Sequence, residues 1–131
     1  MSLHEKMERL HAESLGVIVD NLSSFGVYDP EYVFVEPLIY PVGKPWFFEP
    51  DVFVKERNGS LHIIEYKNSE RARSKAVIQL AHAGFCTMKM LGVYPRLHFV
   101  WDPQELYHSL ISRAERTTTI KNKPPKRRRR R

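Results

Sequence analysis

Residues 50–67, PDVFVKERNGSLHIIEYK, contain two short segments rich in apolar, β-branched and aromatic residues. The turn signal Arg57-Asn58-Gly59 lies between them, and this pattern predicts a β-hairpin. Charged residues stand at the open end of the hairpin, where Asp51 begins the first strand and Glu65 and Lys67 close the second. The hairpin therefore gathers two carboxylates and an amine at one end.

The length of the turn determines whether the two carboxylates face each other. With a two-residue turn at Asn58-Gly59, Val52 would face Glu65, and Asp51 would point to the other face of the sheet. With a three-residue loop that ends in Gly59 as a G1 bulge, Asp51 would lie directly opposite Glu65. Opposed Cβ atoms are about 4.5–5.5 Å apart. A shared metal site therefore requires the three-residue loop and a positive φ at Gly59.

Two adjacent carboxylates and an amine form a recognisable chemical set. Carboxylates that repel each other favour a hard divalent cation, which binds through oxygen ligands. Such a cation polarises a phosphoryl oxygen and lowers the pKa of a bound water. The ammonium of Lys67 can orient that water or stabilise negative charge in the transition state. These residues are suited to the hydrolysis of a phosphodiester.

The rest of the chain predicts an α/β domain over residues 1–120, with a mixed central sheet and flanking helices in an α-β-β-β-α-β core. We expect helices at 3–25, 69–91 and 103–115, and strands at 32–40, 51–57, 60–67 and 96–102. A helix between the third and fourth strands implies that these two strands run parallel. The inner stripe predicted for the second helix comprises Val77, Leu80, Ala81, Gly84, Met88 and Leu91.

Charge is distributed unevenly along the 131 residues, whose formal net charge is +6. Residues 121–131 hold eight of the 21 basic residues and no acid, so the remaining chain has 13 basic and 15 acidic residues. A Pro-Pro step and a run of like charges predict a disordered tail. Such a tail binds polyanions or acts as a localisation signal. Its cations are Lys121, Lys123, Lys126, Arg127, Arg128, Arg129, Arg130 and Arg131.

Cysteine usage and hydropathy indicate an intracellular protein. Cys86 is the single cysteine, so neither an internal disulfide nor a cysteine-based zinc site is expected. The charged N-terminal residues lack the apolar core of a signal peptide, and no apolar run approaches the roughly 20 residues of a membrane span. We expect the cytoplasm or nucleoid, or the nucleus in a eukaryotic host.

The pattern Pro50-Asp51, then 13 intervening residues, then Glu65-Tyr66-Lys67, resembles the signature of the PD-(D/E)XK nuclease superfamily, which has the restriction-endonuclease-like fold. The helix, strand, hairpin, helix and strand order predicted for residues 3–102 is similar to the core of that superfamily. The resemblance implies that Asp51, Glu65 and the Tyr66 backbone carbonyl bind Mg²⁺ or Mn²⁺, and that Lys67 is catalytic.

Two subfamilies share further features with the chain. Many members add a glutamate from the first helix, and Glu13 is the candidate here, with Glu8 as the alternative. Small archaeal Holliday-junction resolvases have a similar layout and length. RecB-type nucleases carry Q-x-x-x-Y on the second helix; the chain has Gln79, but Ala83 stands at the tyrosine position.

The second helix also offers a polar face formed by Arg71, Lys75, Gln79 and His82. We expect Lys75 and Gln79 to support catalysis, and Arg71 and Lys75 to contact phosphates; the alternative is an ordinary solvated face. His62 and His98 are expected to form hydrogen bonds rather than to bind metal. Trp46, Phe47 and Phe48 are expected to cover the sheet edge or join a dimer interface, the alternative being stacking on unpaired bases.

Taken together, these features predict a Mg²⁺- or Mn²⁺-dependent endonuclease that acts on DNA in preference to RNA. A homodimer is expected, because duplex or junction cleavage needs two cuts. The alternatives are a catalytically idle nuclease-fold module that binds nucleic acid, and a structural component of a nucleoprotein.

Overall fold

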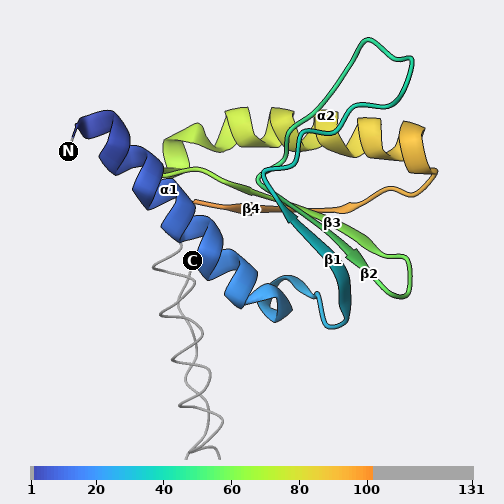
Figure 1. Ribbon diagram of the computed structural model, residues 1–131, viewed down its shortest axis with the longest axis horizontal. Coiled ribbons are helices and arrows are strands. Elements are labelled where there is room, and N and C mark those ends of the chain that lie inside the picture. Colours follow the sequence, from blue (N-terminus) through green and yellow to red (C-terminus); the bar gives the residue numbers. More distant parts are fainter. Residues whose placement is uncertain (1, 102–131) are drawn as a thin grey trace, which may run out of the picture.

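The computed structural model describes residues 2–101, which form an α/β protein with a mixed four-stranded sheet (Figure 1). The sheet order is β1-β2-β3-β4, with β2 antiparallel to both neighbours and β3 parallel to β4 as expected. The helices and strands, with two short 3-10 turns, are α1 (Leu3–Asp20), η1 (Leu22–Phe25), β1 (Pro30–Val35), β2 (Val52–Glu56), β3 (Leu61–Tyr66), η2 (Glu70–Ala72), α2 (Arg73–Leu91) and β4 (Arg96–Val100).

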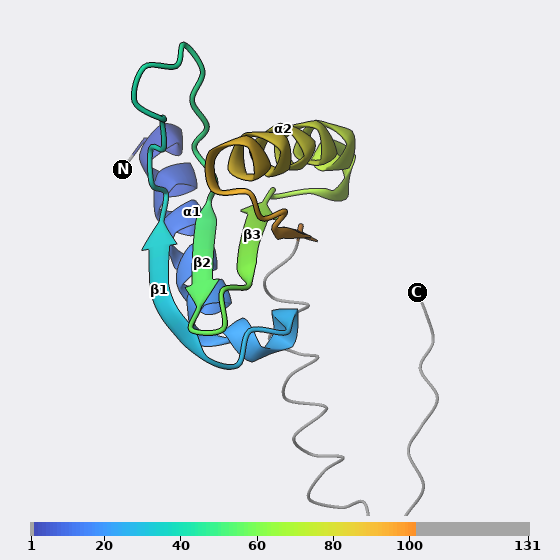
Figure 2. The same cartoon turned by 90° about the vertical axis from the view of Figure 1, so that its right-hand side faces the viewer.

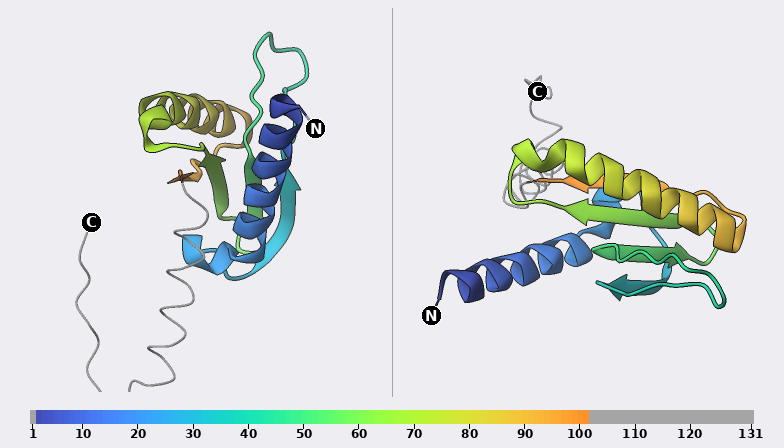
Figure 3. Two further views of the ribbon diagram at one scale, coloured as in Figure 1. Left: turned by 90° about the vertical axis from the view of Figure 1, so that its left-hand side faces the viewer. Right: turned by 90° about the horizontal axis from the view of Figure 1, so that it is seen from above.

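The two helices cover opposite faces of the sheet, as the view from above shows (Figure 3). Because side chains alternate along a strand, Val52 and Ile64 pack against α1, whereas Phe53 and Ile63 pack against α2. Every residue of β3 is buried. The hairpin is therefore the central layer of the protein, and it carries both halves of the core.

The hairpin has the three-residue loop. Phe53 pairs with Ile63 and Lys55 pairs with Leu61, which confirms the register that sets position 51 opposite position 65. Gly59 has a φ of 95° and donates its N–H to the Glu56 carbonyl at 3.0 Å. The predicted positive φ is thus confirmed, and the open end of the hairpin has the alignment that a shared site requires.

Two sequence-based expectations about the elements were wrong. The first strand ends at Val35 rather than at residue 40, because Glu36 has a φ of 52° and Pro37 follows it. The buried stripe of α2 is rotated relative to the prediction, since Val77, Met88 and Leu91 are each about half exposed. The residues that are buried instead are Ala76, Leu80, Ala83, Gly84, Cys86 and Thr87.

The expected helix at 103–115 and the basic tail at 121–131 lie outside the described residues. The tail residues proposed to bind nucleic acid, Lys126 and Arg127 to Arg131, lie outside them as well. Neither helix within residues 2–101 is both long and apolar enough to span a bilayer.

Gly59→Ala should destabilise the protein, because a side chain in the left-handed region costs roughly 1–2 kcal/mol. A Cβ at this position meets no atom within 4 Å, so the cost comes from the backbone alone. Gly16→Ala is the matched control: Gly16 is an exposed residue of α1 that also has open space around it. Its replacement should stabilise the protein by roughly 0.5–1 kcal/mol. Urea denaturation measures both changes, and equal stability of the two variants would contradict the hairpin geometry.

Candidate functional site

Four elements bring polar side chains to one end of the sheet, the end at which β1 and β3 finish and β2 begins (Figure 2). α1 supplies His11, the residue after β1 is Glu36, the residue before β2 is Asp51, and β3 supplies Glu65. Because these elements are distant in the chain, the cluster exists only in the folded sheet.

Asp51 is the centre of this cluster. One carboxylate oxygen, Oδ2, accepts the Tyr66 N–H at 2.7 Å, and the other, Oδ1, lies 3.6 Å from His11 Nε2. The same imidazole nitrogen is 3.4 Å from Glu36 Oε2. Potential ligand atoms of His11, Glu36 and Asp51 all lie within 4.8 Å of one another. This is a mixed nitrogen and oxygen donor set of the kind that holds a divalent ion.

Glu65 lies opposite Asp51 and is only 5% exposed. Its Oε2 accepts the Asp51 N–H at a long 3.4 Å. Burial, followed by the charge of Asp51, raises the pKa of Glu65 to about 8, although the Lys67 ammonium acts in the opposite direction. The direction of this shift favours the protonated carboxyl, whereas a cation bound beside Glu65 would favour release of the proton.

A cleft of about 480 Å³ opens next to the cluster, between the N-terminal half of α1 and the end of the sheet. His11 and Glu36, which contact Asp51, form part of its wall, and Lys67 lines it as well. The Tyr66 ring packs against the His11 ring at a centroid distance of 5.7 Å, which helps to fix the imidazole. The other lining residues are His4, Met7, Glu8, Leu10, Ala12 and Asn68.

The first-helix residue in the cluster is His11 rather than a glutamate. Residues three and four apart share a helix face, so His11 lies on the same face as the buried Ser14 and Leu15. Glu13 is exposed and does not line the cleft. Glu8 does line the cleft, but its Oε1 lies 3.5 Å from the exposed His4. The structure thus does not bring Glu13 to the predicted ligands.

Glu36 and His11 were not among the residues predicted from the sequence. A signal for Glu36 was present, because it follows the apolar run YVFV just as Glu65 follows Ile63 and Ile64. Its φ of 52° places a non-glycine residue in the left-handed region, and its N–H donates to the Asp51 carbonyl at 2.7 Å. Such strained positions cost of order 1–3 kcal/mol and concentrate at functional sites.

The predicted residues of the second helix lie apart from the cleft. Arg71, Lys75 and Gln79 are exposed, and none of them lines it. His82 contacts the Phe47 carbonyl at 3.3 Å, which ties α2 to the aromatic loop. In that loop Phe48 is buried in the core with Phe53 and Leu80, whereas Phe47 is 59% exposed.

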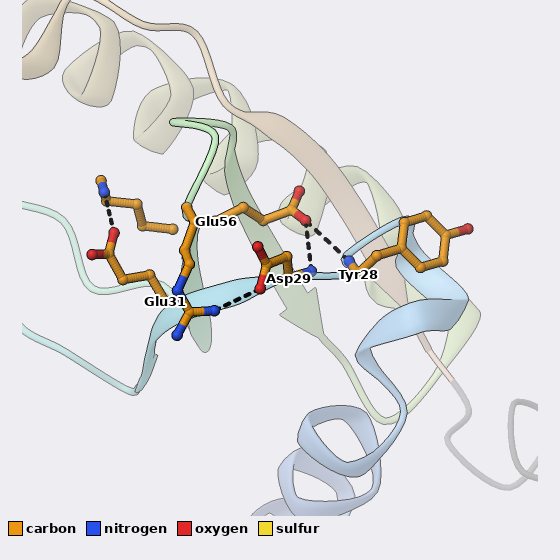
Figure 4. A network of polar contacts seen from close by, with 6 residues as sticks. Tyr28, Asp29, Glu31 and Glu56 are labelled. Carbon is orange, nitrogen blue, oxygen red and sulfur yellow. Dashed lines mark hydrogen bonds and ion pairs between the residues drawn. The ribbon is translucent and has the colours of Figure 1, made fainter.

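A second polar cluster lies at the turn end of the hairpin. Glu56 Oε1 accepts the Tyr28 and Asp29 N–H groups (Figure 4), and Glu56 Oε2 lies 2.9 Å from Nε2 of the buried His62. The hydrogen bond from His62, followed by those from Tyr28 and Asp29, holds the pKa of Glu56 below its ordinary value. His62 Nδ1 lies 3.2 Å from His98 Nε2.

The contact with Glu56 determines which nitrogen of His62 carries a proton. An ionised carboxylate can only accept, so His62 donates from Nε2 to Glu56. Both nitrogens of His62 therefore lie within hydrogen-bond distance of a partner, Nε2 with Glu56 and Nδ1 with His98. This arrangement agrees with the expectation that His62 and His98 form hydrogen bonds.

Stability should fall as the pH drops from about 6.5 to about 4. Burial, followed by the charges of His62 and Arg96, lowers the pKa of His98 to about 4, so the unfolded chain takes up this proton first. His98→Gln should reduce the slope of unfolding free energy against pH in this window by up to about 1.4 kcal/mol per pH unit. Urea titrations at several pH values test this. His4→Gln on the exposed start of α1 is the control, and equal slopes in the two variants would refute the assignment.

Comparisons with protein-family models, with curated proteins and with solved structures gave no match. The geometry itself therefore defines the class of molecule. The described residues form an α/β protein with a histidine and carboxylate cluster at one end of a mixed sheet, beside an open cleft.

Proposed function

We propose that this chain is a metal-dependent DNA endonuclease of the PD-(D/E)XK type, with the restriction-endonuclease-like fold. The observation that carries the proposal is the hairpin register, which sets Asp51 opposite the buried Glu65 at the end of the sheet. The α-β-β-β-α-β order of the described elements also supports it. So does Lys67, which lies two residues after Glu65 and lines the adjacent cleft.

The residues present fit a divalent cation. His11, Glu36 and Asp51 have potential ligand atoms close together, and Glu65 would add a further oxygen ligand. The burial of Glu65, which the Lys67 ammonium offsets only in part, favours a neighbouring positive charge. The backbone carbonyl of Tyr66 remains a predicted ligand. The backbone N–H of the same residue donates to Asp51 and orients its carboxylate. Carboxylates suit both Mg²⁺ and Mn²⁺, whereas an imidazole ligand is better suited to the transition metal. We therefore expect Mn²⁺ to bind more tightly than Mg²⁺.

The side chains of the cluster would have different roles in phosphodiester hydrolysis. A bound Mg²⁺ or Mn²⁺ would polarise a phosphoryl oxygen and lower the pKa of a water. Asp51 is fixed by the Tyr66 N–H, and His11 is fixed by Glu36 and by the Tyr66 ring. Lys67 lines the cleft, and its ammonium would stabilise negative charge on the phosphate as the bond to the leaving oxygen breaks.

Metal binding distinguishes the proposed ligands from the helix glutamate expected from the resemblance. Asp51→Asn and His11→Gln should each weaken Mn²⁺ binding by at least about tenfold, since even residues that only support metal ligands contribute that much. Glu13→Gln, on the exposed side of α1, should leave it unchanged. Calorimetric titration with Mn²⁺ alone measures all three. Unchanged affinity in Asp51→Asn and His11→Gln would rule out this site.

Lys67→Ala should retain Mn²⁺ binding but lower the rate of DNA cleavage by about 10²–10³, the usual cost of removing one group that stabilises charge in the transition state. Supercoiled, linear and branched DNA are each incubated with Mg²⁺, Mn²⁺ or EDTA. Cleavage in EDTA, or cleavage by Lys67→Ala at the wild-type rate, would contradict the mechanism. DNA binding without cleavage in the wild type would favour the idle nucleic-acid-binding module instead.

A further inference from the structure

The outer edge of β1 is apolar and exposed. Tyr32, Val33, Phe34 and Val35 are 52%, 36%, 48% and 49% exposed, although they form one strand of the central sheet. Within residues 2–101, β1 pairs with β2 alone, and its other edge lies on the outside of the sheet (Figure 2). The strand thus offers both unpaired backbone groups and apolar side chains to a partner.

Proteins usually protect such an edge with a lysine, a proline or a bulge. In β1 the protecting features are found only at its beginning, where Pro30 and a register shift precede Tyr32. The run from Tyr32 to Val35 contains neither a charge nor a proline. An exposed apolar edge of this kind is a site of strand pairing rather than a solvated surface.

The hydrogen-bonding direction along β1 identifies the groups that are available. The Glu36 N–H points inward, to the Asp51 carbonyl at 2.7 Å. Direction alternates along an antiparallel strand, so Phe34 also bonds inward, to β2. Val33 and Val35 therefore direct their N–H and C=O groups outward, to the free edge.

We propose that a second copy of this chain pairs with β1 in antiparallel fashion, about a two-fold axis at Val33. In this register Val33 lies opposite Val33 of the partner subunit, and Tyr32 lies opposite Phe34 of the partner subunit. The symmetric contact repeats the aromatic pair, and Tyr32 and Phe34 are already stacked within one chain at 6.0 Å. Four rings then form one cluster on one face of the joined sheet.

Charge and overlap select this register among those that a two-fold axis allows. Glu31 lies opposite Val35 of the partner subunit and is already paired with Lys55 of its own chain. An axis at Glu31 would place two glutamates face to face. An axis at Tyr32, Phe34 or Val35 would shorten the overlap of the run 31–35 with its copy. The axis at Val33 overlaps the whole of this run and opposes no like charges.

The area needed for a stable dimer also favours a second copy. A stable interface buries about 800 Å² on each partner, more than one short strand supplies. Exposed apolar side chains flank β1 on both sides, with Tyr28 (78% exposed) before it and Leu38 (57% exposed) after it, and they enlarge the apolar surface around the edge. In a symmetric pair each contact along this edge is made twice.

Cysteine crosslinking tests both the surface and the register in a Cys86→Ala background, since Cys86 is the single cysteine. Val33→Cys should form a disulfide dimer, because Cα atoms of a hydrogen-bonded pair are about 5.5 Å apart. The reaction should be at least about tenfold faster than for Asn58→Cys at the exposed hairpin tip. A mixture of Tyr32→Cys and Phe34→Cys should crosslink between the two variants, and neither variant should do so alone.

Sedimentation equilibrium of the full chain gives an independent measurement, in EDTA and without DNA, so that its result does not depend on the proposed function. Phe34→Lys should raise the dimer dissociation constant by at least about 100-fold, since two apolar contacts are lost. Phe85→Lys, which replaces a residue that is 59% exposed on α2, should leave it unchanged. A monomeric wild type, or Val33→Cys that reacts no faster than Asn58→Cys, would overturn the proposal. The free edge of β1 would then be expected to pair with residues 102–131 of the same chain or with a different protein.

Discussion

The left-handed conformation of Gly59 sets the alignment of the hairpin, and the other features of the protein depend on that alignment. Because the loop has three residues, β2 and β3 face each other in the register of Phe53 with Ile63. One consequence is the core, since each face of the hairpin presents a continuous apolar surface to one helix. The other is that the open end carries two carboxylates directly opposite each other.

That pair of carboxylates is unfavourable in isolation. Glu65 is buried and lies beside Asp51, and both factors raise its pKa. The surrounding groups provide only part of the compensation, through the Tyr66 N–H, the His11 imidazole and the more distant Lys67. A protein that maintains such a cluster next to an open cleft gives up stability there, which is typical of a site that binds or transforms a ligand.

Local chemistry explains which features could be predicted from the sequence. The turn residues and the two strand ends lie within eighteen positions of one another, so the register and the juxtaposition of Asp51 and Glu65 followed from geometry alone. His11 and Glu36 reach Asp51 through tertiary packing, and no spacing rule connects them. The buried stripe of α2 was predicted wrongly for a related reason. A helix with apolar residues on several sides does not indicate which of them the sheet will cover.

The loop between β1 and β2 begins at Glu36 and ends at Asp51, so its two ends are two of the proposed ligands. The hydrogen bond from the Glu36 N–H to the Asp51 carbonyl joins these ends, and two further backbone hydrogen bonds between Ile39 and Phe48 close the loop above them. Chain added beyond this double closure costs little, because loop entropy grows only slowly with length. The tip around residues 42–44 is therefore a place where a peptide epitope or a small domain can be inserted while Glu36 and Asp51 keep their separation.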